Sequence, residues 1–342
     1  MTLSLNDLGW APFFSNQPHT HSTLTPFRII EVHRDRLLGL GQTGSVSLVT
    51  PHGPTGSFAV GDWVLADPEL RVQQLLERRT ELSRRAGVGD TRLQLIAANV
   101  DVMFITSSCN ADFKAARLER YLALAQGARC YPVVILTKAD RCDDPERFRK
   151  TAEKLAPNLV VLTVNAHDAS DLAEVAKWCP KGQTGVLLGS SGVGKTTLMN
   201  GLTAGTEATQ SIREDDAKGR HTTTARTLRV MTNGGLLVDT PGIRSLRLTE
   251  PEDGLETVFS DLQDLAAQCK FNNCRHESEP GCAVRAACEA GTLAPERVER
   301  WRKLLRDEGR EGESTSQFRA RDKSFGKMVR EVKRIKKGRK GY

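Results

Sequence analysis

The order of two short motifs constrains the fold of this chain more than any other feature of its sequence. A base-reading motif of the form T-K-x-D ends at Asp140, and a phosphate-binding loop begins only later, at Gly189. In the usual arrangement of a P-loop nucleotide site, the phosphate loop comes first and the base motif follows. The reversed order therefore predicts a nucleotide site assembled from a circularly permuted chain.

The phosphate loop fits the pattern G-x-x-x-x-G-K-S/T between an apolar run, Val186-Leu187-Leu188, and a helix-like stretch. Glycines let backbone N–H groups surround phosphate oxygens, and the positive end of the helix dipole faces the same anions. The alternative is a glycine-rich turn with an ordinary surface lysine. The candidate nucleotide-binding residues are Gly189, Ser190, Ser191, Gly192, Val193, Gly194, Lys195, Thr196 and Thr197, with Lys195 neutralising the terminal phosphates and Thr196 binding Mg²⁺.

A second junction between an apolar run and a loop supplies two more candidates. Leu236-Leu237-Val238 leads into Asp239-Thr240-Pro241-Gly242, which has the form D-x-x-G. Such an aspartate approaches Mg²⁺ through water, and the glycine N–H can contact the γ-phosphate of a nucleotide. The same four residues are also typical of ordinary turns. Their position after the phosphate loop is what favours a functional interpretation of Asp239 and Gly242.

A polar, threonine-rich stretch, Lys218 to Thr224, lies between these two motifs. A loop here can supply a second Mg²⁺-binding hydroxyl and close over the γ-phosphate. Thr223 is the candidate for that hydroxyl, and Thr222 is the alternative. A solvated linker is the other interpretation of this stretch.

The base-reading motif Thr137-Lys138-Ala139-Asp140 follows the apolar run Val133-Val134-Ile135-Leu136. Asp140 can accept hydrogen bonds from both N–H groups on the Watson–Crick edge of guanine, whereas adenine offers no such pair of donors. Lys138 can cover the base with its aliphatic stem. Alternatively, Asp140 caps a helix that begins near Asp143.

Four of the eight cysteines crowd into one short stretch together with a histidine. The spacing Cys269-x4-Cys274-x-His276-x5-Cys282 offers three thiolates and one imidazole, the ligand set of a closed structural Zn²⁺ site. Cys288 competes with His276 for the fourth position, and spacing alone does not decide between them. Disulfides, which are disfavoured in a chain without a secretion signal, and unrelated buried thiols are the alternatives.

The basic character of the chain belongs to its C-terminal end. Phe318 to Tyr342 holds eleven Lys or Arg residues and two acidic ones, a net charge of +9, whereas the whole chain of 342 residues carries +7. Such a tail predicts salt-dependent RNA binding, with solubilisation or binding to anionic membranes as alternatives. The N-terminus lacks a signal-peptide pattern and no apolar run is long enough for a membrane span, so we expect a cytoplasmic protein without membrane contact.

Two patterns predict the architecture. Four short apolar-rich stretches, 27–32, 36–40, 45–49 and 62–66, are separated by turn residues and suit a small β-barrel. From about residue 99 to 250, β-rich runs alternate with amphipathic helical stretches, which indicates a mainly parallel α/β sheet. The loops at the carboxyl ends of its strands would gather the motifs into one crevice.

These features resemble a known family, the circularly permuted ribosome small-subunit-dependent GTPase A proteins. The likeness extends to Gly61-Asp62-Trp63-Val64, Leu82-Ser83-Arg84 and Asn99-Val100-Asp101, and it covers roughly residues 26 to 340. It favours His276 over Cys288 as the Zn²⁺ ligand. The resemblance implies a multidomain α/β fold with an N-terminal tail (1–25), an OB-fold barrel (26–82), a circularly permuted P-loop GTPase domain (83–250), a helical zinc-binding domain (251–317) and a basic tail (318–342).

The function that the resemblance implies is hydrolysis of GTP to GDP and phosphate, stimulated by the small ribosomal subunit during its late assembly, with binding to ribosomal RNA. Ile243 stands where many GTPases have the glutamine that orients the attacking water. The family implies His221 as its replacement, so intrinsic turnover is expected to be slow until the subunit orders the loop. The catalytic candidates are therefore His221, Lys195 and Thr223, in a protein expected to be monomeric.

Thr137 departs from the family pattern, because asparagine is usual at this position of the N-K-x-D motif. Threonine keeps a hydroxyl but loses an amide that can both donate and accept hydrogen bonds, so a lower affinity for the base is expected. Together with Ile243, Thr137 motivates an alternative function, an RNA-binding assembly scaffold with a regulatory GTP site and little turnover. A P-loop ATPase or kinase is a third hypothesis, which the permuted order and Asp140 disfavour.

Overall fold

A computed structural model of the chain describes residues 3–18, 23–50, 55–87, 90–203, 226–239 and 258–311, with side chains at all of these except 84–93 and 307–311. The chain divides into two compact units. The first unit comprises Met1–Arg84 and Gln94–Gln263, and the second comprises Arg85–Leu93 and Asp264–Tyr342.

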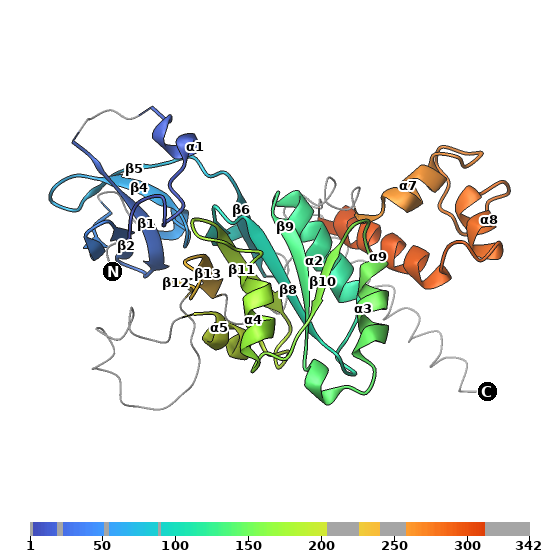
Figure 1. Cartoon of the computed structure of the whole chain (residues 1–342). Helices are drawn as coiled ribbons and strands as arrows, with labels where there is room; N and C mark the ends of the chain where they lie inside the picture. Colours follow the sequence, from blue (N-terminus) through green and yellow to red (C-terminus); the bar gives the residue numbers. More distant parts are fainter. Residues whose placement is uncertain are drawn as a thin grey trace, which may run out of the picture. The chain divides into compact units, whose positions relative to one another are not determined.

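The N-terminal part of the first unit is a small antiparallel barrel (Figure 1). Its strands are β1 (Thr25–Val32), β2 (Leu37–Gly41), β3 (Gly44–Leu48), β4 (Trp63–Ala66) and β5 (Val72–Leu75), with a 3₁₀ turn, η1 (Thr55–Ser57), before β4. Strand β1 pairs with β2 and β4, β2 pairs with β3, and β4 pairs with β5. A bridge between Val49 and Arg71 joins the end of β3 to the start of β5. The predicted β-barrel is therefore confirmed.

Residues 3–18 pack against this barrel. They include one short helix, α1 (Pro12–Ser15), and place Leu8 and Phe14 in an apolar cluster with Trp63. The Trp10 ring meets the Trp63 ring edge-on, with 4.8 Å between the ring centroids. Because Leu8, Phe14 and Trp63 are almost completely buried, this segment is anchored to the barrel by its apolar side chains.

The rest of the first unit is a mainly parallel sheet with the strand order β10-β9-β8-β11-β13-β12. Its strands are β8 (Val102–Ser108), β9 (Tyr131–Thr137), β10 (Val160–Thr163), β11 (Thr184–Gly189), β12 (Thr227–Val230) and β13 (Leu236–Asp239). Neighbours from β10 to β13 are parallel, and only β12 pairs with its neighbour β13 in the antiparallel sense. Strands β8 and β11 are buried along their whole length, as expected where helices cover both faces.

Helices lie on both faces of this sheet (Figure 1). They are α2 (Ala115–Gly127), α3 (Pro145–Glu153), α4 (Ala169–Ala176) and α5 (Lys195–Leu202), with a 3₁₀ turn, η2 (Ala139–Arg141), after β9. On one face, Phe104, Ile135 and Leu187 pack against Val175 of α4 and Leu198 of α5. Helix α2 packs on β8 and β9 and contacts α3. The parallel α/β sheet predicted from the alternating pattern is confirmed.

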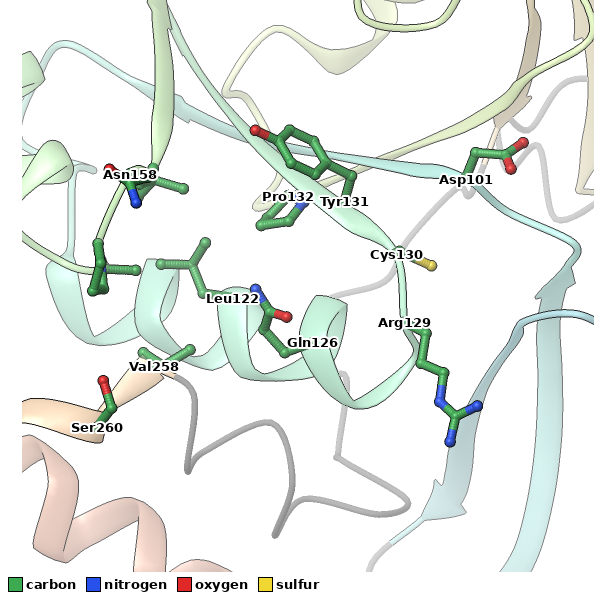
Figure 2. Close-up of a pocket in the computed structure, with 13 residues that line it drawn as sticks. Asp101, Leu122, Gln126, Arg129, Cys130, Tyr131, Pro132, Asn158, Val258 and Ser260 are labelled. Carbon is green, nitrogen blue, oxygen red and sulfur yellow. The ribbon is translucent and has the colours of Figure 1, made fainter. Parts of the chain in front are cut away.

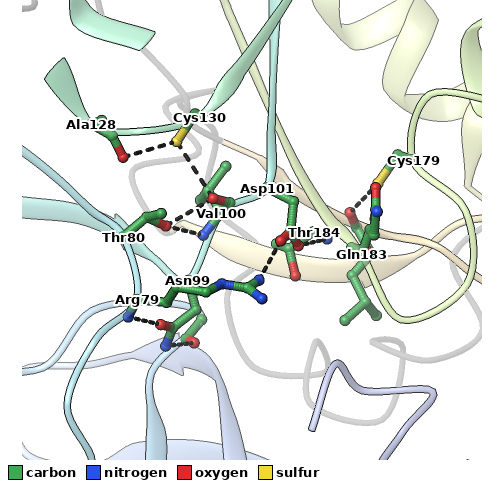
Figure 3. Close-up of polar contacts among 12 residues, drawn as sticks. Arg79, Thr80, Asn99, Val100, Asp101, Ala128, Cys130, Cys179, Gln183 and Thr184 are labelled. Carbon is green, nitrogen blue, oxygen red and sulfur yellow. Dashed lines mark hydrogen bonds and ion pairs between the residues drawn. The ribbon is translucent and has the colours of Figure 1, made fainter. Parts of the chain in front are cut away.

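A buried polar network joins the barrel to the parallel sheet. Arg28 of β1 is 1% exposed and donates to Asn99 O and to Thr184 Oγ1, each at 3.1 Å. Burial lowers the pKa of Arg28 to about 10, so the guanidinium stays charged at neutral pH. Asp101 accepts a hydrogen bond from Thr184 N at 2.8 Å and forms an ion pair with Arg79 (Figure 3). The starts of β8 and β11 are thus fixed against the barrel, and the other end of β11 leads into the phosphate loop.

A two-stranded hairpin and a set of helices account for the remaining elements. Strand β6 (Glu81–Gly87) pairs with β7 (Asp90–Ala98), and the helices are α7 (Ser260–Ala266), α8 (Ala283–Glu289) and α9 (Pro295–Glu311). Val284, Leu293, Val298 and Trp301 are buried in the helical region. Among the helices in the described part of the chain, none combines the length and the apolar character that crossing a bilayer requires.

Candidate nucleotide and metal sites

The phosphate loop connects the end of β11 to the start of α5, as the sequence predicts. Gly189 has a φ of +151°, and a Cβ there would lie 2.3 Å from Thr106 O, so no larger residue fits between β11 and β8. Gly192 and Gly194 have φ values of +82° and +96°, in the left-handed region that favours glycine. Val193, which belongs to the loop, is buried. The backbone geometry at Gly189, Gly192 and Gly194 explains why the motif requires glycine at these positions.

Lys195 and Asp239 provide opposite charges beside this loop. Lys195 Nζ donates to Gly189 O at 2.8 Å and to Ser190 O at 2.6 Å. Burial lowers the pKa of Lys195, and the negative charge of Asp239 opposes that shift. Burial raises the pKa of Asp239, and the positive charges of Arg229 and Lys195 oppose that rise. The end of β13 therefore brings the D-x-x-G aspartate close enough to interact with the phosphate-loop lysine.

The base-reading motif lies directly against the phosphate loop despite its reversed order in the chain. Thr137, at the end of β9, is 1% exposed, and its Oγ1 lies 2.5 Å from Val193 O and 3.1 Å from Ser107 O. Lys138 has a left-handed backbone, with a φ of +60°, and its Nζ donates to Gly192 O at 2.7 Å. Parallel strands end at the same edge of the sheet, which explains how two distant motifs meet here.

Asp140 is not the cap of the helix that follows it. The N-cap of α3 is Asp144, whose Oδ1 accepts a hydrogen bond from Arg147 N at 3.1 Å. Asp140 lies in η2 with an exposed side chain, and its Oδ2 is 3.6 Å from Arg141 Nε. Its carboxylate is therefore accessible to a ligand at the edge where the phosphate loop also lies.

Loss of the Thr137 hydroxyl should loosen the junction between the two loops. We expect Thr137→Val to weaken GTP binding about tenfold, because a buried carbonyl oxygen loses its donor at a cost of about 1.4 kcal/mol. Thr137→Ser keeps the hydroxyl and should bind GTP nearly as tightly as the natural chain. Fluorescence titration with a labelled GTP analogue measures the affinity of both variants. Equal affinities for the valine and serine variants would contradict the expectation.

The remaining predicted nucleotide residues divide into two groups. In the described part of the chain, Ser191 and Thr196 are exposed and Thr197 is half-buried at the start of α5. His221, Thr222, Thr223 and Gly242 lie outside the described residues, as do Ile243 and the basic tail.

Two residues that belong to no sequence motif also contact the phosphate loop. Asp112, from the connection between β8 and α2, and Arg117, from the first turn of α2, both lie within hydrogen-bonding distance of Ser190 Oγ. No motif spacing marks them, since only the pairing of β8 with β11 brings this connection to the loop.

The cysteine cluster converges on one point in the second unit. The ligand atoms of Cys269, Cys274, His276 and Cys282 all lie within 4.8 Å of one another. His276 Nδ1 lies 3.5 Å from Cys269 Sγ and 3.4 Å from Cys282 Sγ, and the two sulfurs are 3.9 Å apart. Bond lengths for tetrahedral Zn²⁺ give edges of about 3.8 Å between sulfurs and about 3.5 Å between sulfur and nitrogen. The four groups can therefore hold one metal ion, and Cys288 is not among them.

A separate pocket of about 780 Å³ lies away from the nucleotide motifs (Figure 2). Its lining includes Asp101, Tyr131 and Leu159, which lie at or just before the starts of β8, β9 and β10. The Tyr131 ring stacks on Trp178 with 5.8 Å between centroids. The base motif follows the carboxyl end of β9 and the phosphate loop follows the carboxyl end of β11. The pocket lies at the opposite ends of the parallel strands, so it is not part of the nucleotide site.

Known proteins share both the sequence and the fold. The model of the RsgA GTPase family matches residues 75–249. A protein of Mesorhizobium japonicum named "Small ribosomal subunit biogenesis GTPase RsgA" is 52% identical over 88% of this chain and 89% of its own length. A Vibrio parahaemolyticus protein named "Small ribosomal subunit biogenesis GTPase RsgA 2" is 43% identical over 98% of this chain and 94% of its own length.

Two solved structures have a similar fold. The crystal structure of YjeQ from Thermotoga maritima superposes with a TM-score of 0.61 at 22% identity, covering 83% of this chain and 98% of YjeQ. The structure of YloQ, described as a circularly permuted GTPase, has a TM-score of 0.58 at 24% identity, covering 86% of this chain and 98% of YloQ. With the permuted loops in contact and a family model that matches across them, the chain belongs to the RsgA GTPase family and is a circularly permuted GTP hydrolase.

Proposed function

We propose that this chain hydrolyses GTP most rapidly on the small ribosomal subunit, where it acts as a checkpoint late in subunit assembly and binds ribosomal RNA. The contact between the two permuted loops carries the proposal, since Thr137 Oγ1 lies 2.5 Å from Val193 O and Lys138 Nζ donates to Gly192 O. Two relatives that cover most of the chain are named as GTPases of small ribosomal subunit biogenesis, which supports the choice of partner.

We assign the roles at the nucleotide by the place of each residue. The backbone N–H groups from Gly189 to Thr197 would surround the phosphates, and Lys195 would neutralise the charge on the terminal ones. The Asp140 carboxylate would read guanine, while the Lys138 stem covers the base beside Thr137. The Gly242 N–H would contact the γ-phosphate. The half-buried Lys195 and the exposed Asp140 both suit these roles.

Mg²⁺ would bind with the nucleotide through hydroxyl oxygens of the chain. Thr196, at the exposed start of α5, and Thr223 would supply these oxygens, with Thr222 as the alternative to Thr223. Asp239 would act on the ion through water, and its position near Lys195 supports that role. When bound, Mg²⁺ neutralises charge that develops on the phosphates.

We propose Zn²⁺ as the ion held by Cys269, Cys274, His276 and Cys282. Three thiols and an imidazole form a donor set that Zn²⁺ prefers, and the distances between their atoms match a tetrahedral site. The ion would be structural, because four protein ligands leave no position for a substrate. We also place the domain boundaries after residues 25, 82, 250 and 317, so that the metal site lies in a domain of its own.

RNA contacts would come from the ends of the chain. The tail from Phe318 to Tyr342 carries a net charge of +9, which suits the phosphates of ribosomal RNA. The five-stranded barrel is a second candidate, through its shape and backbone rather than through base stacking. A factor that acts on ribosomal subunits in a bacterium works in the cytoplasm, and we propose that it does so as a monomer.

His221 should be needed for the stimulated reaction rather than for binding. We expect His221→Ala to lower subunit-stimulated GTP turnover by about 100-fold, the scale of a lost proton-transfer or water-orienting group, with little change in GTP affinity. Turnover is measured as phosphate release with purified small ribosomal subunits, and His167→Ala, at an exposed position, serves as the control. Full stimulation of the His221 variant would remove this residue from the mechanism.

A scaffold with little turnover is the second candidate function, and Ile243 favours it because its side chain cannot orient water. The departure of Thr137 from the N-K-x-D pattern is weak support for the scaffold, because the Thr137 hydroxyl contacts the phosphate loop. Tight GTP binding without stimulation by the subunit would favour the scaffold over the checkpoint GTPase.

A further inference from the structure

A ring of three side chains holds the phosphate loop from one side. Ser190 Oγ lies 2.7 Å from Asp112 Oδ2 and 2.5 Å from Arg117 NH1, and NH1 is also 3.1 Å from the same carboxylate oxygen. The hydroxyl can donate to the carboxylate while it accepts from the guanidinium, so all three contacts can form at once. Ser190 is the second residue of the loop, and its hydroxyl is thereby bonded to side chains outside the nucleotide motifs.

Local structure presents the Asp112–Arg117 pair to the loop. Asn110 Oδ1 accepts from Ser108 Oγ and from Asp112 N, each at 2.9 Å, which fixes the turn that leaves β8. Arg117 follows in the first turn of α2. The hydrogen bond from Ser190 is the main cause of the lowered pKa of Asp112, so this contact favours the carboxylate form.

The backbone of Ser190 is tied to the binding lysine as well. Ser190 O accepts from Lys195 Nζ at 2.6 Å, so this one residue links Lys195 to the Asp112–Arg117 pair. The loop glycines Gly189 and Gly192 both have positive φ values, and glycine gains the most conformational freedom when a restraint is lost. A restraint on the Ser190 side chain therefore limits the conformations of the whole turn.

We propose that Asp112 and Arg117 are positioning residues that act through Ser190 to hold the phosphate loop ready for the part of the nucleotide that GDP and GTP share. This inference rests on the proposed nucleotide roles of the loop. Without the ring, the loop must be ordered at the moment of binding, and this cost weakens affinity without changing the chemical step. The side chains of this ion pair are partly exposed, at 32% for Arg117 and 40% for Asp112. Its Coulomb energy is therefore small, and the pair acts mainly by fixing the position of Ser190.

Binding of GDP and GTP to four variants tests the proposal. We expect Ser190→Ala and Arg117→Ala each to raise both dissociation constants about fivefold, the effect of one lost hydrogen bond. Arg117→Ala, which lies outside the nucleotide motifs, should leave turnover at saturating GTP unchanged. The double variant should bind no more weakly than either single one, because both changes break the same ring. Ser190→Thr keeps the hydroxyl and should restore affinity.

Lys114→Ala is the matched control. It removes a positive charge next to the same helix start, and Lys114 interacts with Asp112 only through its charge. Additive losses in the double variant, an equal loss in Lys114→Ala, or lower turnover with unchanged affinity would each overturn the positioning role. Failure of the natural chain to bind either nucleotide would instead contradict the proposed function itself.

Discussion

Replacement of Lys195 by alanine is expected to lower GTP turnover by at least about 100-fold, which corresponds to about 2.7 kcal/mol of lost transition-state stabilisation. The Nζ group lies in the loop between Gly189 O and Ser190 O, and Asp239 interacts with its charge. A charge held in a partly buried site stabilises developing phosphate charge more strongly than one in open water. Removal of the group leaves the loop without the positive charge of its lysine.

Phosphate release from GTP, with and without small ribosomal subunits, measures this effect. Lys195→Met retains most of the side-chain volume and should show the same loss, which separates charge from packing. Lys154→Ala changes an exposed lysine at the end of α3 and should be as active as the natural chain. Comparable turnover of the two Lys195 variants and the Lys154 variant would contradict the assignment of the phosphate loop.

Cys282→Ser is expected to remove the metal ion and unfold the helices that surround the cluster. The Cys282 side chain is almost fully buried, its Sγ lies 3.4 Å from His276 Nδ1, and it also forms the N-cap of α8. Binding free energy of a structural Zn²⁺ ion is folding free energy for a small domain, on the order of 10 kcal/mol. A lost ligand should therefore abolish protection of residues 264–311 from proteolysis.

Zinc content by elemental analysis and limited proteolysis together test this expectation. Cys288→Ser is the matched control, because it changes the same residue type a short distance along the chain but outside the four-residue cluster. It should keep one Zn²⁺ per chain. Retention of zinc by the Cys282 variant and its loss from the Cys288 variant would reverse the ligand assignment.

The nucleotide motifs were predictable because their chemistry is local. Each motif follows an apolar run, and the parallel sheet brings the ends of β9, β11 and β13 to one edge. The glycines of the phosphate loop are dictated by backbone geometry, as the 2.3 Å approach of a Cβ at Gly189 to Thr106 O shows. These motifs can be predicted because the residues that determine each one lie next to one another in the sequence.

Features that depend on tertiary context were not predictable. Strand β5 contains two glutamines, Gln73 and Gln74, and only Val72 is fully buried, so its sequence lacks a clear alternation. In the β6–β7 hairpin, β6 is rich in polar and charged residues and the apolar residues of β7 gather only in its second half, so neither strand shows a clear alternation along its length. Both elements are held by the strands beside them rather than by their own periodicity.

The choice of His276 as a metal-site residue has a similar origin. Spacing left Cys288 open, but His276 adopts a left-handed backbone with a φ of +58°, and this turn carries its ring to the thiols. The Asp112–Arg117 pair escaped notice for the same reason, since its partner Ser190 is distant in the chain. Contacts made across strands leave no spacing signal in the sequence.

Phosphate release from GTP and from ATP, each with and without purified small ribosomal subunits, tests the central claim most directly. The two hydrogen bonds that Asp140 can accept from guanine predict a preference for GTP of about 100-fold, together with strong stimulation of GTP turnover by the subunit. Equal use of ATP and GTP would show that the permuted motif does not read guanine, and it would contradict the account at its foundation.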